Sequence, residues 1–220
     1  MDTPKFSWKE AVGFGWDTMK ANLWFFVGLL FAAFLIKFIP SQLAEMFKKS
    51  NISLYIIFTI ISIFFGALVD MGLIRTSLKM CNKEKGDIFD LFNCYPIFFK
   101  YMLAAILYGL MILGGFLLLI VPGIILAIRG GMYQFLIIDK GLGPIESIKE
   151  SFRITKGSGW DLFSLYCILL GINILGILAL FLGLFVTVPV TMVATAFVYR
   201  KLLVVIEQNK EKLATLTAQG

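Results

Sequence analysis

The sequence predicts an all-α polytopic membrane protein with about six transmembrane helices in three hairpins, each hairpin preceded by an amphipathic interfacial helix. Three observations predict this fold: the composition, six long apolar runs, and the placement of Lys and Arg. Of the 220 residues, 59% are hydrophobic and 15% are charged, and the mean hydropathy is +0.89. Soluble domains average roughly half apolar and about a quarter charged residues. A soluble fold of this size could not cover so much apolar surface, so lipid is the main solvent.

Six runs are long and apolar enough to cross a bilayer, for which a helix needs about 20 residues. They are residues 23–39, 52–74, 101–120, 122–138, 160–185 and 189–206. The third and fourth form one stretch that would be about 57 Å long as a single helix, almost twice the hydrocarbon thickness, so it must fold back. We expect the turn just before Pro122, and a similar turn before Pro189, because proline suits the first position of a helix.

The basic residues predict which side each connection faces. Most of the 20 Lys and Arg residues precede the first run, separate the second from the third and the fourth from the fifth, or follow the sixth. The other side holds Lys48 and Lys49, with Lys37 at its edge. Because cytoplasmic loops of membrane proteins are enriched in Lys and Arg, we expect both termini in the cytoplasm and the protein in the inner (plasma) membrane.

A polar and amphipathic segment precedes each predicted hairpin. The first starts with Ser7 and Glu10, which have capping-box spacing, and continues with apolar residues at helical intervals. The second starts at Asp87 with Asp90 at the third helical position, and the third starts at Pro144. We expect these helices to lie flat in the headgroup layer, where lysines attract anionic lipid. The candidate lipid-surface cations are Lys20, Lys100, Lys149, Arg153 and Lys156.

The three segments resemble one another, which suggests a single membrane domain, 1–220, with internal repeats at 6–80, 86–140 and 143–206. Glu10, Trp16 and Lys20 of the first align with Glu146, Phe152 and Lys156 of the third. An acidic residue at the start of a helix and a lysine near its end also suit the helix dipole. The match therefore has two explanations: common descent of the three segments, or the charge preferences that all helix ends share.

Two charged residues within the predicted spans are candidate functional residues. Arg129 lies about seven residues into the fourth span, where an unpaired charge would cost several kcal/mol. We expect it to face the bundle interior, with a structural role, bonding backbone carbonyls or snorkelling outward, or else a contact with a substrate or headgroup. Asp70 lies near the cytoplasmic end of the second span, at a different depth, and we expect its partner to be Arg153 or Lys156.

No motif in the sequence indicates a reaction. The chain has no histidine, which removes the usual general base and zinc ligand. It also has no phosphate-binding Gly-rich loop, no GxSxG and no paired intramembrane carboxylates. The three cysteines show no CxxC spacing. We therefore expect no enzymatic activity, no cofactor, no catalytic residue, no metal site and no nucleic-acid partner.

Three stretches of the second half resemble a known group of proteins. They read IVPGIILAIR, FLIIDKGLGPIESIKESFRITKGSGWDLF and TVPVTMVATAFVYRKLL. Over roughly residues 85–205 the chain resembles six-helix bacterial inner-membrane proteins of largely unknown function, related to the membrane domain of glycerophosphoryl diester phosphodiesterases. It lacks their catalytic domain, so their activity does not carry over. The resemblance implies a stand-alone membrane module.

The first functional hypothesis is a non-enzymatic membrane module that acts at the lipid surface, on anionic membrane lipids, or with an envelope protein partner. The alternative is a small transporter or channel component with a polar path at Arg129, and a lipid-modifying enzyme is third. A solvent-accessible cavity reaching Arg129 would favour transport. A closed bundle with exposed basic helices would favour the module.

Overall fold

The structure, a computed structural model, describes residues 6–218, and the side chains up to residue 208. In this part of the chain all regular structure is helical, and six helical segments are long and apolar enough to cross a membrane, which confirms the predicted fold class. The elements in order are α1 (Trp8–Ala21), α2 (Leu23–Phe47), α3 (Ile52–Cys81), η1 (Ile88–Leu91), η2 (Tyr95–Ile97), α4 (Phe98–Leu118), α5 (Ile120–Gly130), α6 (Tyr133–Lys140), α7 (Pro144–Ile154), α8 (Gly159–Leu178) and α9 (Leu184–Ala218).

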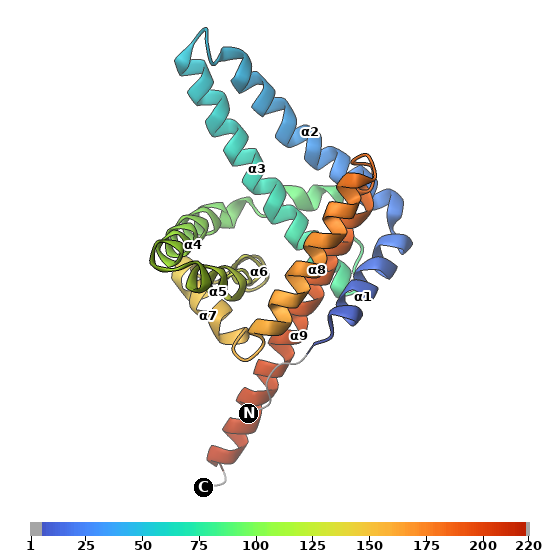
Figure 1. Cartoon of the computed structure of the whole chain (residues 1–220), viewed down its shortest axis with the longest axis vertical. Coiled ribbons are helices and arrows are strands. Elements are labelled where there is room, and N and C mark those ends of the chain that lie inside the picture. Colours follow the sequence, from blue (N-terminus) through green and yellow to red (C-terminus); the bar gives the residue numbers. More distant parts are fainter. Residues whose placement is uncertain (1–5, 219–220) are drawn as a thin grey trace.

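The three hairpins α2–α3, α4–α5 and α8–α9 splay apart from a packed base. In Figure 1 the α2–α3 hairpin extends to the top, whereas α4 and α5 are seen almost end-on. Every buried residue of α3 lies at Leu68 or beyond, so only its second half is packed. The main apolar cluster gathers residues near the other ends of the hairpins, including Cys81, Leu142 and Ile154. The connections between hairpins therefore meet at the base, and the outer halves present apolar side chains for lipid to cover.

The fourth span is broken, which the sequence analysis did not predict. Its first part, α5, ends at Gly130, and α6 begins at Tyr133 after a two-residue turn. The turn into this span lies at Leu119, so Pro122 is the third residue of α5 rather than its first. A membrane helix can break in this way only where other groups satisfy its freed backbone carbonyls.

The last two helices are also bounded differently from the prediction. The turn between α8 and α9 covers residues 179–183, so Pro189 lies inside α9 and does not start it. Leu180 and Phe181 both have positive φ angles, which make the turn tight. A Cβ on Gly183 would lie 2.7 Å from the Cα of Gly176, so the two helices touch through glycine next to this turn. The start of α9 therefore coincides with the close approach of Gly183 to Gly176, and not with Pro189.

The segment before α4 is not the predicted amphipathic helix. It forms two short 3-10 turns, η1 and η2, with a capping box between Asp87 and Asp90. Leu91 is buried, and a Cβ on Gly72 of α3 would lie 2.2 Å from its Cα. The backbone of η1 therefore presses directly on α3 at Gly72.

Helix α1 packs lengthwise on α9 and does not lie alone on a surface. Glu10 forms a 3.0 Å ion pair with Lys201, and a Cβ on Gly15 would lie 2.5 Å from the carbonyl oxygen of Val190. The two helices are thus antiparallel and in close contact. Ser7 is the N-cap, but its side chain makes no capping hydrogen bond. The predicted capping box is therefore wrong, and Glu10 pairs with α9 instead.

Candidate functional site

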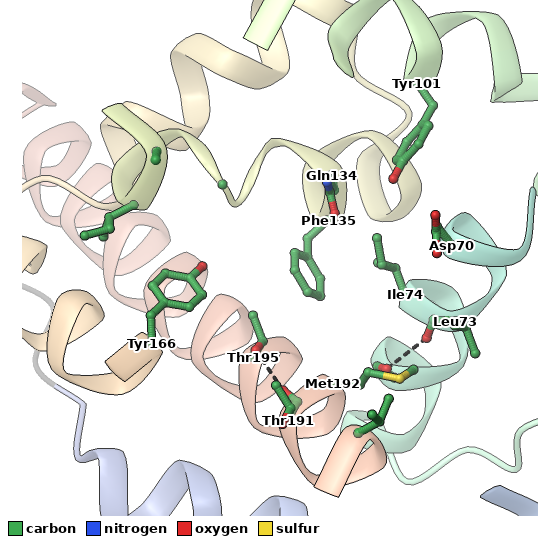
Figure 2. A pocket seen from close by; sticks show the side chains of 15 residues that line it. Asp70, Leu73, Ile74, Tyr101, Gln134, Phe135, Tyr166, Thr191, Met192 and Thr195 are labelled. Carbon is green, nitrogen blue, oxygen red and sulfur yellow. Dashed lines mark hydrogen bonds between the residues drawn. The ribbon is translucent and has the colours of Figure 1, made fainter. Parts of the chain in front are cut away.

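A cavity of about 660 Å³ lies where α3, α4, α5, α6, α8 and α9 converge (Figure 2). Most of its wall is apolar, and includes Leu73, Ile74 and Phe135. Asp70 lies at its edge with half of its side chain exposed, so the cavity is open to the outside. A cavity of this size with a few polar groups on an apolar wall has the character of a small-molecule site.

Hydrogen-bond donors point into the cavity from three directions. Figure 2 shows the hydroxyls of Tyr101, from α4, and Tyr166, from α8, directed into this space. Among the described residues neither hydroxyl has a hydrogen-bond partner. Gln134, from α6, lies between them and donates to the hydroxyl of Tyr133 at 3.3 Å. The two tyrosines can therefore donate to a polar group of a ligand without breaking any existing bond.

Helix α9 contributes a row of threonines at four-residue spacing. Thr191 donates to the carbonyl of Thr187, and Thr195 donates to that of Thr191, both at 2.8 Å. Thr191 also accepts a 2.9 Å hydrogen bond from Asn173 of α8. Because these hydroxyl protons are used within the helix, Thr191 and Thr195 present acceptors to the cavity. Ser77 of α3, whose proton goes to Leu73, is a third such acceptor.

Asp70 pairs with Lys37 of α2 at 2.5 Å, and not with Arg153 or Lys156 as we expected. Both residues lie in the interiors of membrane-spanning helices. The sequence analysis placed Lys37 at the edge of the opposite side, but its side chain reaches the neighbouring helix of the same hairpin. Each side chain is about half exposed, at 42% for Lys37 and 50% for Asp70. Ionisable residues inside a membrane mark functional paths more often than chance, so this pair belongs to the candidate site.

Arg129 does not line the central cavity. Its Nη2 atom donates to the carbonyl of Phe152 on α7 at 2.9 Å, and the guanidinium lies over the Phe152 ring. Ser151 shares its hydroxyl proton between the carbonyl oxygens of Arg129 and Gly130, at 2.8 Å each. The hydroxyl of Thr155 donates to the carbonyl of Ser151 at 2.8 Å and also approaches that of Arg129 at 3.2 Å. Helix α7 thus satisfies the backbone groups freed by the break in the fourth span.

A second polar network joins α6 to α9. Arg200 donates two hydrogen bonds to Asp139, at 2.8 and 2.9 Å, and Tyr199 donates a third at 3.0 Å. Bidentate pairs of this kind fix geometry as well as charge. The sequence analysis used Arg200 only as a topology signal and missed the pair. Both residues of this pair lie in the stretches that carry the resemblance, Asp139 in the second and Arg200 in the third.

The five candidate lipid-surface cations do not form one surface. Lys149, Arg153 and Lys156 are exposed on α7 and the turn after it, and Lys100 reaches the carbonyl of Gly141 just before α7. Lys20 lies over the Trp16 ring at the end of α1, about 15 Å further along the helix than Glu10. The structure therefore groups four of these cations near α7 and separates Lys20 from them.

Comparisons of the chain with protein-family models, with curated proteins and with solved structures gave no match. The resemblance to six-helix inner-membrane proteins accordingly stays a prediction. The cavity residues Tyr101, Gln134, Tyr166 and Thr191 were missed by the sequence analysis. One usable signal was present, because Thr191 and Thr195 share a helix face in the predicted sixth span.

Proposed function

We propose that the chain is a non-enzymatic module of the inner (plasma) membrane that holds an amphipathic lipid in its central cavity. The observation that carries this proposal is the pair of unpartnered tyrosine hydroxyls, Tyr101 and Tyr166, facing each other across an apolar cavity of about 660 Å³. An apolar wall suits acyl or glycerol carbons, and hydroxyl and amide donors suit ester or phosphate oxygens.

The ion pair at the edge of the cavity extends the same chemistry. Lys37 can donate hydrogen bonds to a lipid phosphate and Asp70 can accept them from an ammonium group, so the pair matches a zwitterionic headgroup in both signs. The edge of the cavity at the half-exposed Asp70 lies within a membrane-spanning helix, α3. A lipid can therefore enter from the bilayer without crossing water. The alternative of transport along a path at Arg129 has less support, because this side chain does not line the central cavity and bonds the carbonyl of Phe152 on α7.

The lipid proposal is tested with a photoactivatable zwitterionic phospholipid, phosphatidylethanolamine with a diazirine on one acyl chain. In reconstituted vesicles we expect crosslinks on peptides that line the cavity. The double variant Tyr101→Phe with Tyr166→Phe removes both donors and keeps the ring shapes. It should lower the crosslink yield about thirtyfold, because two hydrogen bonds contribute about 1 kcal/mol each. Mass spectrometry of the digested protein gives both the position and the yield.

Tyr95→Phe is the matched control, because Tyr95 is 70% exposed and lies outside the cavity. It should leave the yield unchanged. Equal yields in all three proteins, or crosslinks spread evenly over the lipid-facing helices, would contradict a lipid site in the cavity.

We further propose that the base of the molecule, where the connections meet, faces the cytoplasm together with both termini. The support is the excess of Lys and Arg in these connections. Single cysteines at Lys85 and Lys140, in a cysteine-free background, should be protected from a membrane-impermeant maleimide in intact cells. Cysteines at Lys49 and Leu182, in the hairpin tips, should react. Labelling of Lys85 and Lys140 from opposite sides would overturn the six-span arrangement.

A further inference from the structure

A second groove, separate from the central cavity, lies between α5 and α8. Its volume is about 420 Å³, and its wall is apolar along Val121, Ile125 and Phe163. Arg129 and Trp160 lie at one end of it. From Val121 to Arg129 the groove follows α5 for about 12 Å. It is therefore an apolar groove along a membrane helix, with the cation of Arg129 and the indole of Trp160 at the end nearer the base.

The guanidinium of Arg129 has hydrogen-bond donors that no residue described in the structure uses. Within the described part of the chain it makes one hydrogen bond, to Phe152, and no ion pair with an acidic residue, and its buried Nε atom has no partner. Arginine carries five N–H donors in a fork that matches phosphate oxygens. A cation in a membrane span without an acidic partner is costly. An anionic ligand at this end of the groove would offset that cost.

The surroundings of Arg129 favour a lipid as that ligand. Lys156 is exposed in the turn just before α8, whereas Arg153, one helical turn earlier, pairs with Glu150 at 3.5 Å. Trp160 is 81% exposed at the start of α8. Tryptophan is typical of the membrane interface, and basic pockets between spans bind anionic headgroups. The positive charge at one end and the apolar wall along the rest match the two parts of an anionic phospholipid.

We infer that the α5–α8 groove binds an anionic phospholipid, with one acyl chain along Val121, Ile125 and Phe163 and the phosphate at Arg129. Lys156 supplies a second positive charge at the headgroup. Because this groove shares neither Arg129 nor Trp160 with the central cavity, failure of this inference would leave the cavity proposal standing.

The test uses Trp160 as a reporter. In the full-length chain the other three tryptophans, Trp8, Trp16 and Trp24, are replaced by Phe, and the protein is reconstituted into phosphatidylcholine vesicles. A minor fraction of brominated phosphatidylglycerol or of brominated phosphatidylcholine is included. We expect bromine to quench Trp160 fluorescence at a several-fold lower mole fraction of phosphatidylglycerol than of phosphatidylcholine.

Arg129→Gln and Lys156→Gln should each reduce this preference about fivefold, the contribution of one cation near an anionic lipid. Lys20→Gln, an exposed cation beside Trp16 on α1, is the matched control and should leave it unchanged. Lys156 is exposed, so its variant decides the question if Arg129→Gln does not fold. Equal quenching by the two lipids would overturn the inference, as would a preference that persists in Lys156→Gln and in any folded Arg129→Gln protein. Loss of the preference in inorganic phosphate would show a free-anion site and would also overturn it.

Discussion

Replacement of Arg200 by Leu is expected to lower the free energy of unfolding by about 3 kcal/mol, one of the two largest effects that we predict. Arg200 holds Asp139 through two hydrogen bonds, and both side chains are mostly buried, at 29% and 16% exposure. Leu would leave the Asp139 carboxylate without its cation, in contact with Tyr199 alone. The measurement is reversible unfolding in detergent micelles by titration with sodium dodecyl sulfate, followed by near-UV circular dichroism.

The neighbouring residue gives the control. Lys201 also forms an ion pair, with Glu10, but both side chains are about half exposed, so Lys201→Gln should change stability by less than about 1 kcal/mol. The double variant Asp139→Asn with Arg200→Gln should lose less than the sum of the two single variants, because no unpaired charge remains. Equal losses for Arg200→Leu and Lys201→Gln would show that the bidentate pair does not hold α6 to α9.

Residue type and run length were enough to predict the spans, since the bilayer imposes one length scale on every helix. Each of the first five predicted spans begins within three residues of the first residue of a helix in the structure. The ends were harder to predict. Pro40 and Pro189 lie inside helices, although proline usually marks a boundary. In lipid a helix passes through proline more easily, because neighbouring groups satisfy the carbonyl that proline leaves free.

The candidate site could not be predicted in the same way, because it depends on which helix faces touch. Asp70 forms its ion pair with Lys37 of the same hairpin, and not with the cations near α7. Bonding to a backbone carbonyl was one of the roles left open for Arg129, but the partner, Phe152, lies on a helix that we expected to rest on the membrane surface. In spans that are apolar on all sides, hydrophobic periodicity does not identify the buried face. Polar side chains such as those of Ser151 and Thr155 mark it instead.

The second large effect concerns this serine face of α7. Ser147 and Ser151 are both fully buried, but their hydroxyls differ in role. Ser151 donates across to the carbonyls of Arg129 and Gly130 at the break between α5 and α6, whereas Ser147 donates to Pro144 in its own helix. Ser151→Ala should lower the free energy of unfolding by about 2 kcal/mol, because it strips a donor from buried carbonyls. The same detergent titration measures the loss.

Ser147→Ala is the matched control, with the same substitution on the same buried face. It should change stability by less than about 0.5 kcal/mol, because the higher helix propensity of alanine offsets the lost local bond. Thr155 bonds the same Arg129 carbonyl at 3.2 Å, so Thr155→Val combined with Ser151→Ala should lose more than either change alone. Hydrogen exchange should quicken at the amides next to the break, in α5 and α6, in Ser151→Ala only. Equal behaviour of the two serine variants would mean that the break holds without α7, and that the position of Arg129 has another cause.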